Sequence, residues 1–366
     1  MKCRFCKGDI SIFLDLSDIP LSVTSDLRVV NIGIKVFRCD HCGLLQKDSS
    51  EKIQNEYFNE FYSQPLTDGD EQIKFIGNTP YPRSELIIKK IEKYMQERGQ
   101  ILDIGTGSGV FLKSYQKFFP KWELFAQDIQ ENSINHLLKL MPKENFYLGD
   151  IKNIKTRFEL ISIIGVLGHI PNLLTFLEEL HKISNDSKIV IQTPDIQKNF
   201  FDVVIIDHIT FFSKSMLYKI LSKYFADISF FDVINKEITT AINFKEKKEN
   251  FDCEKEEKDI LIQSKRFKNF VTYLFHSKES FVVLGSAPVS TYIGAILKNR
   301  LMCFVDEDKS KQGKTHLNTF IKDFASINKN DVIILPFLQE EIVCEIKKRH
   351  CAYKFISFED VDNYEK

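Results

Sequence analysis

The segment Ile101-Leu102-Asp103-Ile104-Gly105-Thr106-Gly107-Ser108-Gly109 predicts how the middle of the chain folds. Its apolar start is typical of a buried strand, and its glycines predict a tight turn that leads into a helix. An amphipathic pattern over Ser84–Arg98 predicts another helix just before the strand. A glycine turn at the carboxyl end of a parallel strand leaves the backbone open to a ligand, so the segment also predicts a binding site.

Strand and helix patterns alternate on the C-terminal side of this turn. Apolar runs typical of buried strands occur at Glu123–Ala126, Leu160–Ile164 and Lys188–Thr193. Helical patterns lie between them at Ser133–Leu140 and Leu173–Ile183. Such alternation predicts an α/β unit with a parallel sheet.

A second, smaller alternation follows a charge-dense segment at 245–266, which we interpret as a solvated helix between domains. Strands are expected at Ser280–Leu284, Met302–Val305 and Asp331–Leu335, with a helix near Ser290–Asn299. The pattern predicts a second Rossmann-like unit.

Two Cys-x-x-Cys pairs near the start of the chain supply four cysteines, Cys3, Cys6, Cys39 and Cys42. Four thiolates are the ligand set of a closed, structural Zn²⁺ site, which has no open position for water. Gly43 suits the turn of such a site, because backbone amides must face the sulfur atoms. Four buried, reduced cysteines without metal are the alternative. The first 50 or so residues lack helical periodicity, and we expect a small ribbon whose order depends on the metal.

The charge of the 366-residue chain is balanced, with 50 Lys plus Arg against 51 Asp plus Glu. No overall positive field is therefore available to attract nucleic acid or an anionic membrane. No stretch reaches the roughly 18 apolar residues that cross a bilayer, and the N-terminus lacks the apolar core of a signal peptide. We expect a cytoplasmic protein with neither nucleic acid nor a membrane as a partner.

The glycine spacing after the first strand distinguishes between two nucleotide cofactors. Gly105, Gly107 and Gly109 follow the strand, whereas a dinucleotide fingerprint places its third glycine at position 110, which here is Val110. The spacing therefore disfavours an NAD-dependent dehydrogenase and favours a methyl-donor nucleoside, S-adenosylmethionine.

Three aspartates are candidates for binding this donor. We expect Asp103, two residues before the first glycine, to meet the ammonium group of the donor. Asp128, at the end of the second strand, is expected to accept hydrogen bonds from both ribose hydroxyls. Asp150, after the next probable strand, is a candidate for the adenine amino group. The alternative for each is a helix cap or a solvated turn, and for Asp150 both interpretations stay open.

Two histidines are further candidates. His169 lies in the loop after the fourth strand, where it would contact the donor, the acceptor or a structural hydrogen-bond partner. Asp207 and His208 form a titratable pair within the apolar segment 206–212. Burial of an ionised group without a partner costs roughly several kcal/mol, so such a pair suggests a function, whereas a lone core histidine more often does not.

These motifs together resemble the sugar C-methyltransferases that act on nucleotide-linked 4-keto-6-deoxy sugars, and the likeness extends over nearly the whole chain. In the N-terminal part it rests on Cys3-Arg4-Phe5-Cys6, Leu14-Asp15-Leu16, Ile19-Pro20-Leu21 and Cys39-Asp40-His41-Cys42-Gly43-Leu44-Leu45-Gln46. In the centre it rests on Ile101-Leu102-Asp103-Ile104-Gly105, His169-Ile170-Pro171, Phe201-Asp202 and Asp207-His208-Ile209-Thr210-Phe211-Phe212-Ser213. In the C-terminal part it rests on Val305-Asp306-Glu307-Asp308-Lys309-Ser310-Lys311-Gln312-Gly313-Lys314 and Asp331-Val332-Ile333-Ile334-Leu335-Pro336.

The resemblance implies a class I S-adenosylmethionine-dependent methyltransferase core, α/β and Rossmann-like, with a further domain on either side. We assign residues 1–55 to a zinc-binding domain, 56–245 to the methyltransferase domain and 246–366 to a C-terminal Rossmann-like domain. The family holds its nucleotide-sugar substrate between domains.

The resemblance also implies catalytic residues. In the family pattern the active-site base is a His that follows a Glu and has a Tyr three positions before it. Here the base is His208, Asp207 replaces the Glu, and Ile205 occupies the Tyr position. A further family tyrosine is most similar to Tyr62. The glycine-rich turn of the last domain is reduced to Gly285-Ser286-Ala287-Pro288.

We therefore predict C-methylation of a nucleotide-linked keto sugar through an enolate, with His208 as the base. Asp207 or a backbone carbonyl is expected to fix the tautomer of its imidazole. The changes at 205 and 207 keep open an alternative, the methylation of oxygen or nitrogen on a sugar nucleotide or a surface-glycan precursor, which needs no enolate. A third possibility is a binding protein without catalysis, against which the presence of Asp103, Asp128 and His208 argues.

Overall fold

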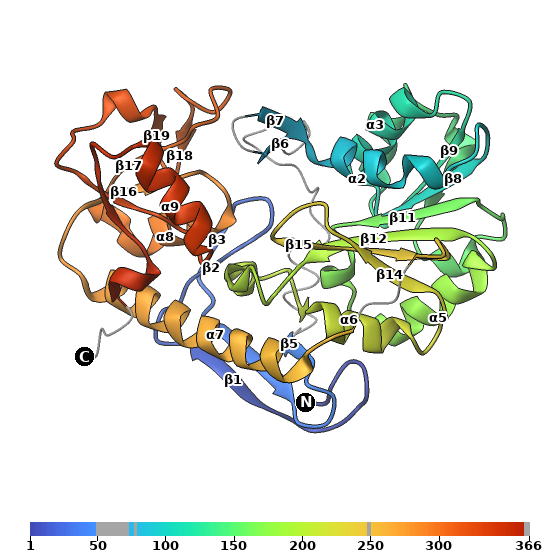
Figure 1. Cartoon of the computed structure of the whole chain (residues 1–366), viewed down its shortest axis with the longest axis horizontal. Coiled ribbons are helices and arrows are strands. Elements are labelled where there is room, and N and C mark those ends of the chain that lie inside the picture. The colour runs from blue at the N-terminus through green and yellow to red at the C-terminus, as the bar shows by residue number, and fades with distance from the viewer. Residues whose placement is uncertain (49–72, 77–78, 247–249, 362–366) are drawn as a thin grey trace.

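Within the described residues, the strands form an N-terminal, a central and a C-terminal β-sheet together with two separate hairpins (Figure 1). The structure is a computed structural model that describes residues 1–48, 73–76, 79–246 and 250–361. Among these residues, no helix is both long and apolar enough to cross a membrane.

The N-terminal sheet has four antiparallel strands, three of them from the start of the chain. Their order is β1 (Ile10–Leu16), β4 (Ile34–Cys39), β5 (Leu45–Lys47) and β13 (Thr210–Phe211). A separate hairpin joins β2 (Ser22–Val23) to β3 (Val29–Val30). Because β13 comes from the middle of the chain, the cysteine-rich ribbon and the central part share one sheet.

The central sheet has seven strands. Their order is β10 (Phe146–Leu148), β9 (Glu123–Asp128), β8 (Gln100–Ile104), β11 (Leu160–Ile164), β12 (Lys188–Pro194), β15 (Glu237–Ile242) and β14 (Ile228–Phe231). The first five strands are parallel, which confirms the predicted parallel sheet, and β15 runs antiparallel to both of its neighbours. Another hairpin, β6 (Ile73–Ile76) with β7 (Thr79–Pro82), precedes it.

Helices cover both faces of the central sheet, because alternate residues of a buried strand point to opposite sides. The helices are α2 (Arg83–Ile91), α3 (Val110–Phe118), α4 (Ile134–Leu137), α5 (Leu173–Ser184) and α6 (Lys214–Leu221). Ile101 of β8 packs in one cluster with side chains of α2 and α3, and its neighbour Leu102 packs in another with α5 and α6. Both predicted helices are shorter than expected. The one at 84–98 ends early because α2 passes into a 3₁₀ turn at Glu92–Tyr94, and the one at 133–140 is reduced to α4.

The C-terminal sheet confirms the predicted second Rossmann-like unit. Its order is β18 (Thr315–His316), β19 (Thr319–Lys322), β17 (Leu301–Val305), β16 (Phe281–Leu284), β20 (Val332–Ile334) and β21 (Lys354–Ile356). All pairs are parallel except β18 with β19. Its helices are α8 (Pro288–Leu297) and α9 (Glu340–Arg349).

A long helix, α7 (Cys253–His276), connects the central and C-terminal parts and lies along the N-terminal sheet in Figure 1. The charged start of this helix fits the predicted solvated helix. Its second half differs, because Phe267, Phe270 and Leu274 are fully buried in one cluster with residues of the N-terminal and C-terminal sheets. The predicted domain boundaries at 55/56 and 245/246 stay predictions, since the chain around each includes residues outside the described ranges.

Candidate active site

The glycine turn after β8 forms one wall of the site. Gly105, Gly107 and Gly109 all have left-handed backbone, with φ of +67°, +54° and +74°. A Cβ atom at Gly105 would lie 2.5 Å from Val166 Cγ2, and one at Gly109 would overlap Leu137. At Gly107 no atom lies within 4 Å of the position of a Cβ. The outer two glycines therefore permit packing, while the middle one leaves open space for a ligand.

Two of the predicted donor-binding aspartates lie at this turn. The Asp128 carboxylate accepts hydrogen bonds from the amides of Gly107 at 2.8 Å and Gln130 at 2.9 Å. A carboxylate has about four acceptor positions, so two remain for ribose hydroxyls. Asp103 is 3% exposed and accepts a 2.6 Å hydrogen bond from Ser162 Oγ. Burial raises the pKa of Asp103 to about 7.

The third aspartate, Asp150, is exposed and caps the 3₁₀ turn Ile151–Asn153 by accepting a 3.0 Å hydrogen bond from the Lys152 amide. The capping alternative is thus present in the structure. The turn begins beside the donor wall, because the neighbouring Gly149 donates its amide to the Asp128 carbonyl at 2.8 Å. Contact of Asp150 with adenine stays a prediction.

His208 is paired with Asp202, which lies six residues earlier in the 3₁₀ turn Phe200–Val204. The Nδ1 atom of His208 lies 2.7 Å from Asp202 Oδ1. Burial alone would lower the pKa of His208, but Asp202 and Asp207 outweigh it, and the net pKa is raised above its ordinary value. The His208 side chain remains 12% exposed. With Nδ1 donating to a carboxylate, Nε2 keeps its lone pair as a base.

We expected Asp207 or a backbone carbonyl to orient the His208 ring, but its partner is Asp202, and Asp207 has other partners. Its carboxylate accepts hydrogen bonds from Ser25, from the amide at 2.9 Å and from the hydroxyl. Its backbone carbonyl lies 2.9 Å from Nδ1 of His169. The rings of His169 and His208 meet edge to face with centroids 4.5 Å apart. His169 is therefore a neighbour of the base, and burial lowers its pKa to about 4.

Sequence reasoning missed three residues of this cluster: Asp202, Ser25 and Lys47. Asp202 carried a signal, since it belongs to the Phe201-Asp202 motif, but the adjacent Asp207 was the more obvious partner. No local pattern marked Ser25 or Lys47, because both come from the N-terminal ribbon. The other predicted catalytic residue, Tyr62, lies outside the described residues.

A cavity of about 1250 Å³ separates the central and C-terminal sheets. Asp202 and Ile205 line it beside the base, and Ser108 lines it beside the donor turn. On the opposite side it is lined by the turn Gly285–Pro288, which connects β16 to α8. Both β8 and β16 have their successor on one side and a later strand on the other, and ligands of open α/β sheets bind at such points.

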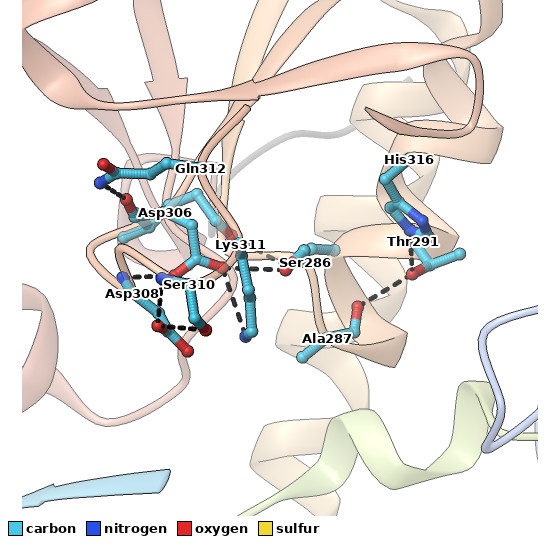
Figure 2. Close-up of polar contacts among 11 residues, drawn as sticks. Ser286, Ala287, Thr291, Asp306, Asp308, Ser310, Lys311, Gln312 and His316 are labelled. Atoms are coloured by element: carbon cyan, nitrogen blue, oxygen red, sulfur yellow. Dashed lines mark hydrogen bonds and ion pairs between the residues drawn. The ribbon is translucent and has the colours of Figure 1, made fainter. Parts of the chain in front are cut away.

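The second turn has its own polar network (Figure 2). Ser286 Oγ donates to Asp306 Oδ2 at 2.9 Å, and Lys311 Nζ lies 3.4 Å from the same oxygen. Asp306 follows β17, the strand after the turn, and Gly285 has a φ of +79°. The arrangement offers a carboxylate, a cation and a helix N-terminus to one ligand.

The cavity wall is predominantly basic. Among the described residues its cationic side chains are Lys74, Lys113, Lys117, Lys139, Lys236, Lys311 and Lys314, accompanied by His136. The carboxylates of the same wall are Asp202 and Asp308. Some lysines have acidic partners, such as Lys74 with Glu237 at 2.9 Å. The wall as a whole favours an anionic ligand.

The four N-terminal cysteines are brought together as predicted. Sγ of Cys3 lies 3.6 Å from that of Cys42, Sγ of Cys6 lies 3.4 Å from that of Cys39, and all four sulfurs are within 4.8 Å of one another. Tetrahedral zinc with bonds of about 2.3 Å places sulfurs roughly 3.8 Å apart, so the cluster fits this metal. Gly43 has the expected left-handed backbone, with φ of +80°.

Comparison with known proteins identifies the central part of the chain. Residues 81–227 match a family model described as a methyltransferase domain. Ribosomal protein L11 methyltransferase of Exiguobacterium sibiricum is 29% identical over 115 residues, which are 30% of this chain and 35% of that protein. The same enzyme of Fusobacterium nucleatum subsp. nucleatum is 25% identical over 137 residues, 35% of this chain and 43% of that protein. The matches thus span less than half the length of these relatives.

Among solved structures, an S-adenosylmethionine-dependent methyltransferase from Clostridium acetobutylicum is similar with a TM-score of 0.34 and 14% identity. The similarity covers 44% of this chain and 89% of that one. Because residues 81–227 match the methyltransferase family model, the parallel strands within them form the Rossmann-like core of a methyltransferase domain in this mixed α/β fold.

Proposed function

We propose that this protein is an S-adenosylmethionine-dependent methyltransferase that methylates a carbon atom of a nucleotide-linked keto sugar, with His208 as the base. The observation that carries the proposal is the position of the His208–Asp202 pair. Asp202 lines the cavity that the donor turn at Ser108 and the second turn at Gly285 also line. The carboxylate partner of the base, one residue of the donor turn and the second turn thus line one cavity, while His208 itself lies behind Asp202.

The donor end of the cavity fits the nucleoside. When bound, S-adenosylmethionine supplies a methyl group on a positively charged sulfur, which is already a potent electrophile. The open space at Gly107 lets the donor approach the backbone of the turn closely. Asp128 has acceptor positions left for the ribose hydroxyls, and Asp103 supplies a buried carboxylate for the ammonium group.

The base, His208, removes a proton from the sugar substrate. The carbon next to a ketone carries an acidic proton, and Nε2 of His208 takes it while Nδ1 stays bound to Asp202. The electron pair of the broken C–H bond passes through the enolate into the new bond to the methyl group. The bond between that methyl group and the donor sulfur would break with its electron pair going to sulfur, so that S-adenosylhomocysteine would leave and the proton would stay on His208. The protein must supply positioning and proton removal, and Asp202 holds the imidazole in the tautomer that this step needs.

The acceptor end suits a nucleotide diphosphate. Lys311 and Lys314 supply positive charge for the phosphates at this end, and the ten-residue helix α8 directs its N-terminus at the turn that begins with Gly285. Asp306, held by Ser286 and Lys311, stands where a ribose would need an acceptor. We further propose a structural zinc ion on the four cysteines, because a closed set of four thiolates leaves no position for a substrate.

One observation favours the alternative of methylation on oxygen or nitrogen. Ile205 lines the cavity where the related family has a tyrosine hydroxyl, so that position offers no hydrogen bond to an enolate oxygen. An acceptor hydroxyl or amine has no enolate and still needs a base. Asp202 and His208 would serve it equally, and the two reactions differ in the fate of the proton next to the ketone.

The experiment that tests the proposal uses His208→Asn, with His181→Asn on the exposed end of α5 as the control. We expect His208→Asn to keep its affinity for S-adenosylhomocysteine in calorimetry, because the donor turn is a different wall. Turnover should fall about 10²–10⁴-fold, the usual contribution of a general base. Near-normal methyl transfer by His208→Asn would contradict the assignment of the base.

A further inference from the structure

The N-terminal sheet delivers a lysine to the candidate base. Lys47 is the last residue of β5, and its amide donates a 3.0 Å hydrogen bond to the Ile209 carbonyl, next to His208. Only 2% of Lys47 is exposed. A lysine is rarely buried to this extent unless charged or polar groups surround it, so its partners need an explanation.

The side chain of Lys47 contacts the segment that carries the base. Its Nζ atom donates a hydrogen bond to the Ile205 carbonyl and lies 5.2 Å from the centroid of the Phe211 ring. Burial lowers the pKa of Lys47 to about 7, and the carboxylates of Asp202 and Asp207 oppose that effect. At neutral pH the amine is therefore partly protonated, and its protonated form is the positive member of a cluster with two carboxylates.

The charges around His208 come from four elements. Asp202 faces it from the 3₁₀ turn, Asp207 from its own loop, His169 from the turn after β11, and Lys47 from β5. Because its pKa is low, His169 is neutral at pH 7. Two negative charges therefore favour a proton on His208, and Lys47 is the cation that opposes them.

We propose that Lys47 is a positioning residue that limits the proton affinity of His208 and so keeps its Nε2 atom free to act as a base. The inference rests on the proposed function of His208. Without the cation, two buried carboxylates would hold a proton on the imidazole at neutral pH, and the base would be occupied before the substrate arrives. The pairing of β5 with β13 thus has a chemical role, because it holds Lys47 beside the segment that carries the base.

The test is an NMR titration of the His208 ring in histidine-labelled protein, with His208→Asn to assign its signal. We expect Lys47→Met and Lys47→Gln to raise the pKa of His208 by about one unit or more, the usual effect of a nearby charge. Gln keeps a hydrogen-bond donor for the Ile205 carbonyl, and Lys47→Arg keeps the charge and should leave the pKa near that of the wild type. Lys35→Met, which changes a partly exposed lysine of the neighbouring strand that pairs with Asp15, is the matched control.

Several outcomes separate the claims. A pKa of His208 that is unchanged in Lys47→Gln and Lys47→Met overturns the inference, as would a rise that Lys47→Arg shares. If the neutral variants do not fold, the wild type still decides. Two coupled groups each report both titration steps of the pair, so independent single steps of Lys47 and His208 would overturn the inference. The acid limb of the kcat/KM profile should move upward with the pKa of His208. A shifted pKa without any methyl transfer would count against the proposed function alone.

Discussion

At the scale of single residues, neighbours in sequence do not share partners. Asp207 and His208 are adjacent, yet the carboxylate of Asp207 binds Ser25 while the imidazole of His208 binds Asp202. The 3₁₀ turn Phe200–Val204 folds the chain back so that a residue six positions away reaches the ring. Sequence spacing predicted that His208 has a carboxylate partner but selected the wrong one, because side-chain direction depends on the turn.

This difference leads to a prediction about two aspartates. Asp202→Asn should lower kcat/KM about 10²–10⁴-fold, because an amide can donate to Nδ1 and leave the proton on Nε2, where the base needs a lone pair. Asp207→Asn should have the smaller effect, since it acts through Ser25 and His169. Steady-state kinetics of both variants, with circular dichroism to check folding, make the comparison. A larger loss in Asp207→Asn would restore the original assignment.

Asp103 predicts how donor binding depends on pH. Burial raises its pKa to about 7 in the free protein, and the ammonium group of the donor prefers the ionised form. Below pH 7 binding must therefore expel a proton, so affinity for S-adenosylhomocysteine should weaken about tenfold per pH unit and level off above pH 7. Calorimetry from pH 5.5 to 8 would measure this. Asp103→Asn should bind more weakly and lose the dependence, and the same slope in the variant would assign it to another group.

At the scale of elements, the sequence predicted what local patterns encode. Leu160–Ile164 is apolar except for Ser162, and β11 has these bounds. β13 was not predicted, because a strand of two residues has no periodicity and exists through its pairing with β5, far away in sequence. The same holds for Lys47, which reaches the base through that pairing. The buried half of α7 was missed because its charged first turns dominated the pattern.

The cysteine cluster gives the prediction at this scale. Cys39→Ser removes one thiolate of four, so we expect the roughly one zinc per chain of the wild type to be lost. Hydrogen exchange should rise in β1, β4 and β5, and in β13, which pairs with β5. Strand β8 should stay protected because it lies in the middle of another sheet. Metal analysis and exchange mass spectrometry test this, with Cys351→Ser at an exposed position as the control. Freshly purified wild type without zinc would refute it.

At the scale of the whole molecule, two Rossmann-like sheets present their ligand-binding turns to one cavity. One sheet carries the donor turn, which reaches the cavity through Ser108, and the other carries the turn that begins with Gly285. The ribbon of the N-terminal sheet holds the segment with the base beside this cavity. The cavity volume of about 1250 Å³ fits a sugar attached to a nucleotide together with the donor. A small acceptor would leave much of this volume empty.

The most direct test of the central claim is to find where the methyl group goes. The protein is incubated with donor labelled with ¹³C in its methyl group and with a panel of nucleotide-linked keto sugars, and the product is mapped by two-dimensional NMR. We predict that the wild type forms a new carbon–carbon bond at the position next to the ketone, and that His208→Asn forms it much more slowly. A labelled methyl group on oxygen or nitrogen, or on no member of a panel that the protein binds, would contradict it.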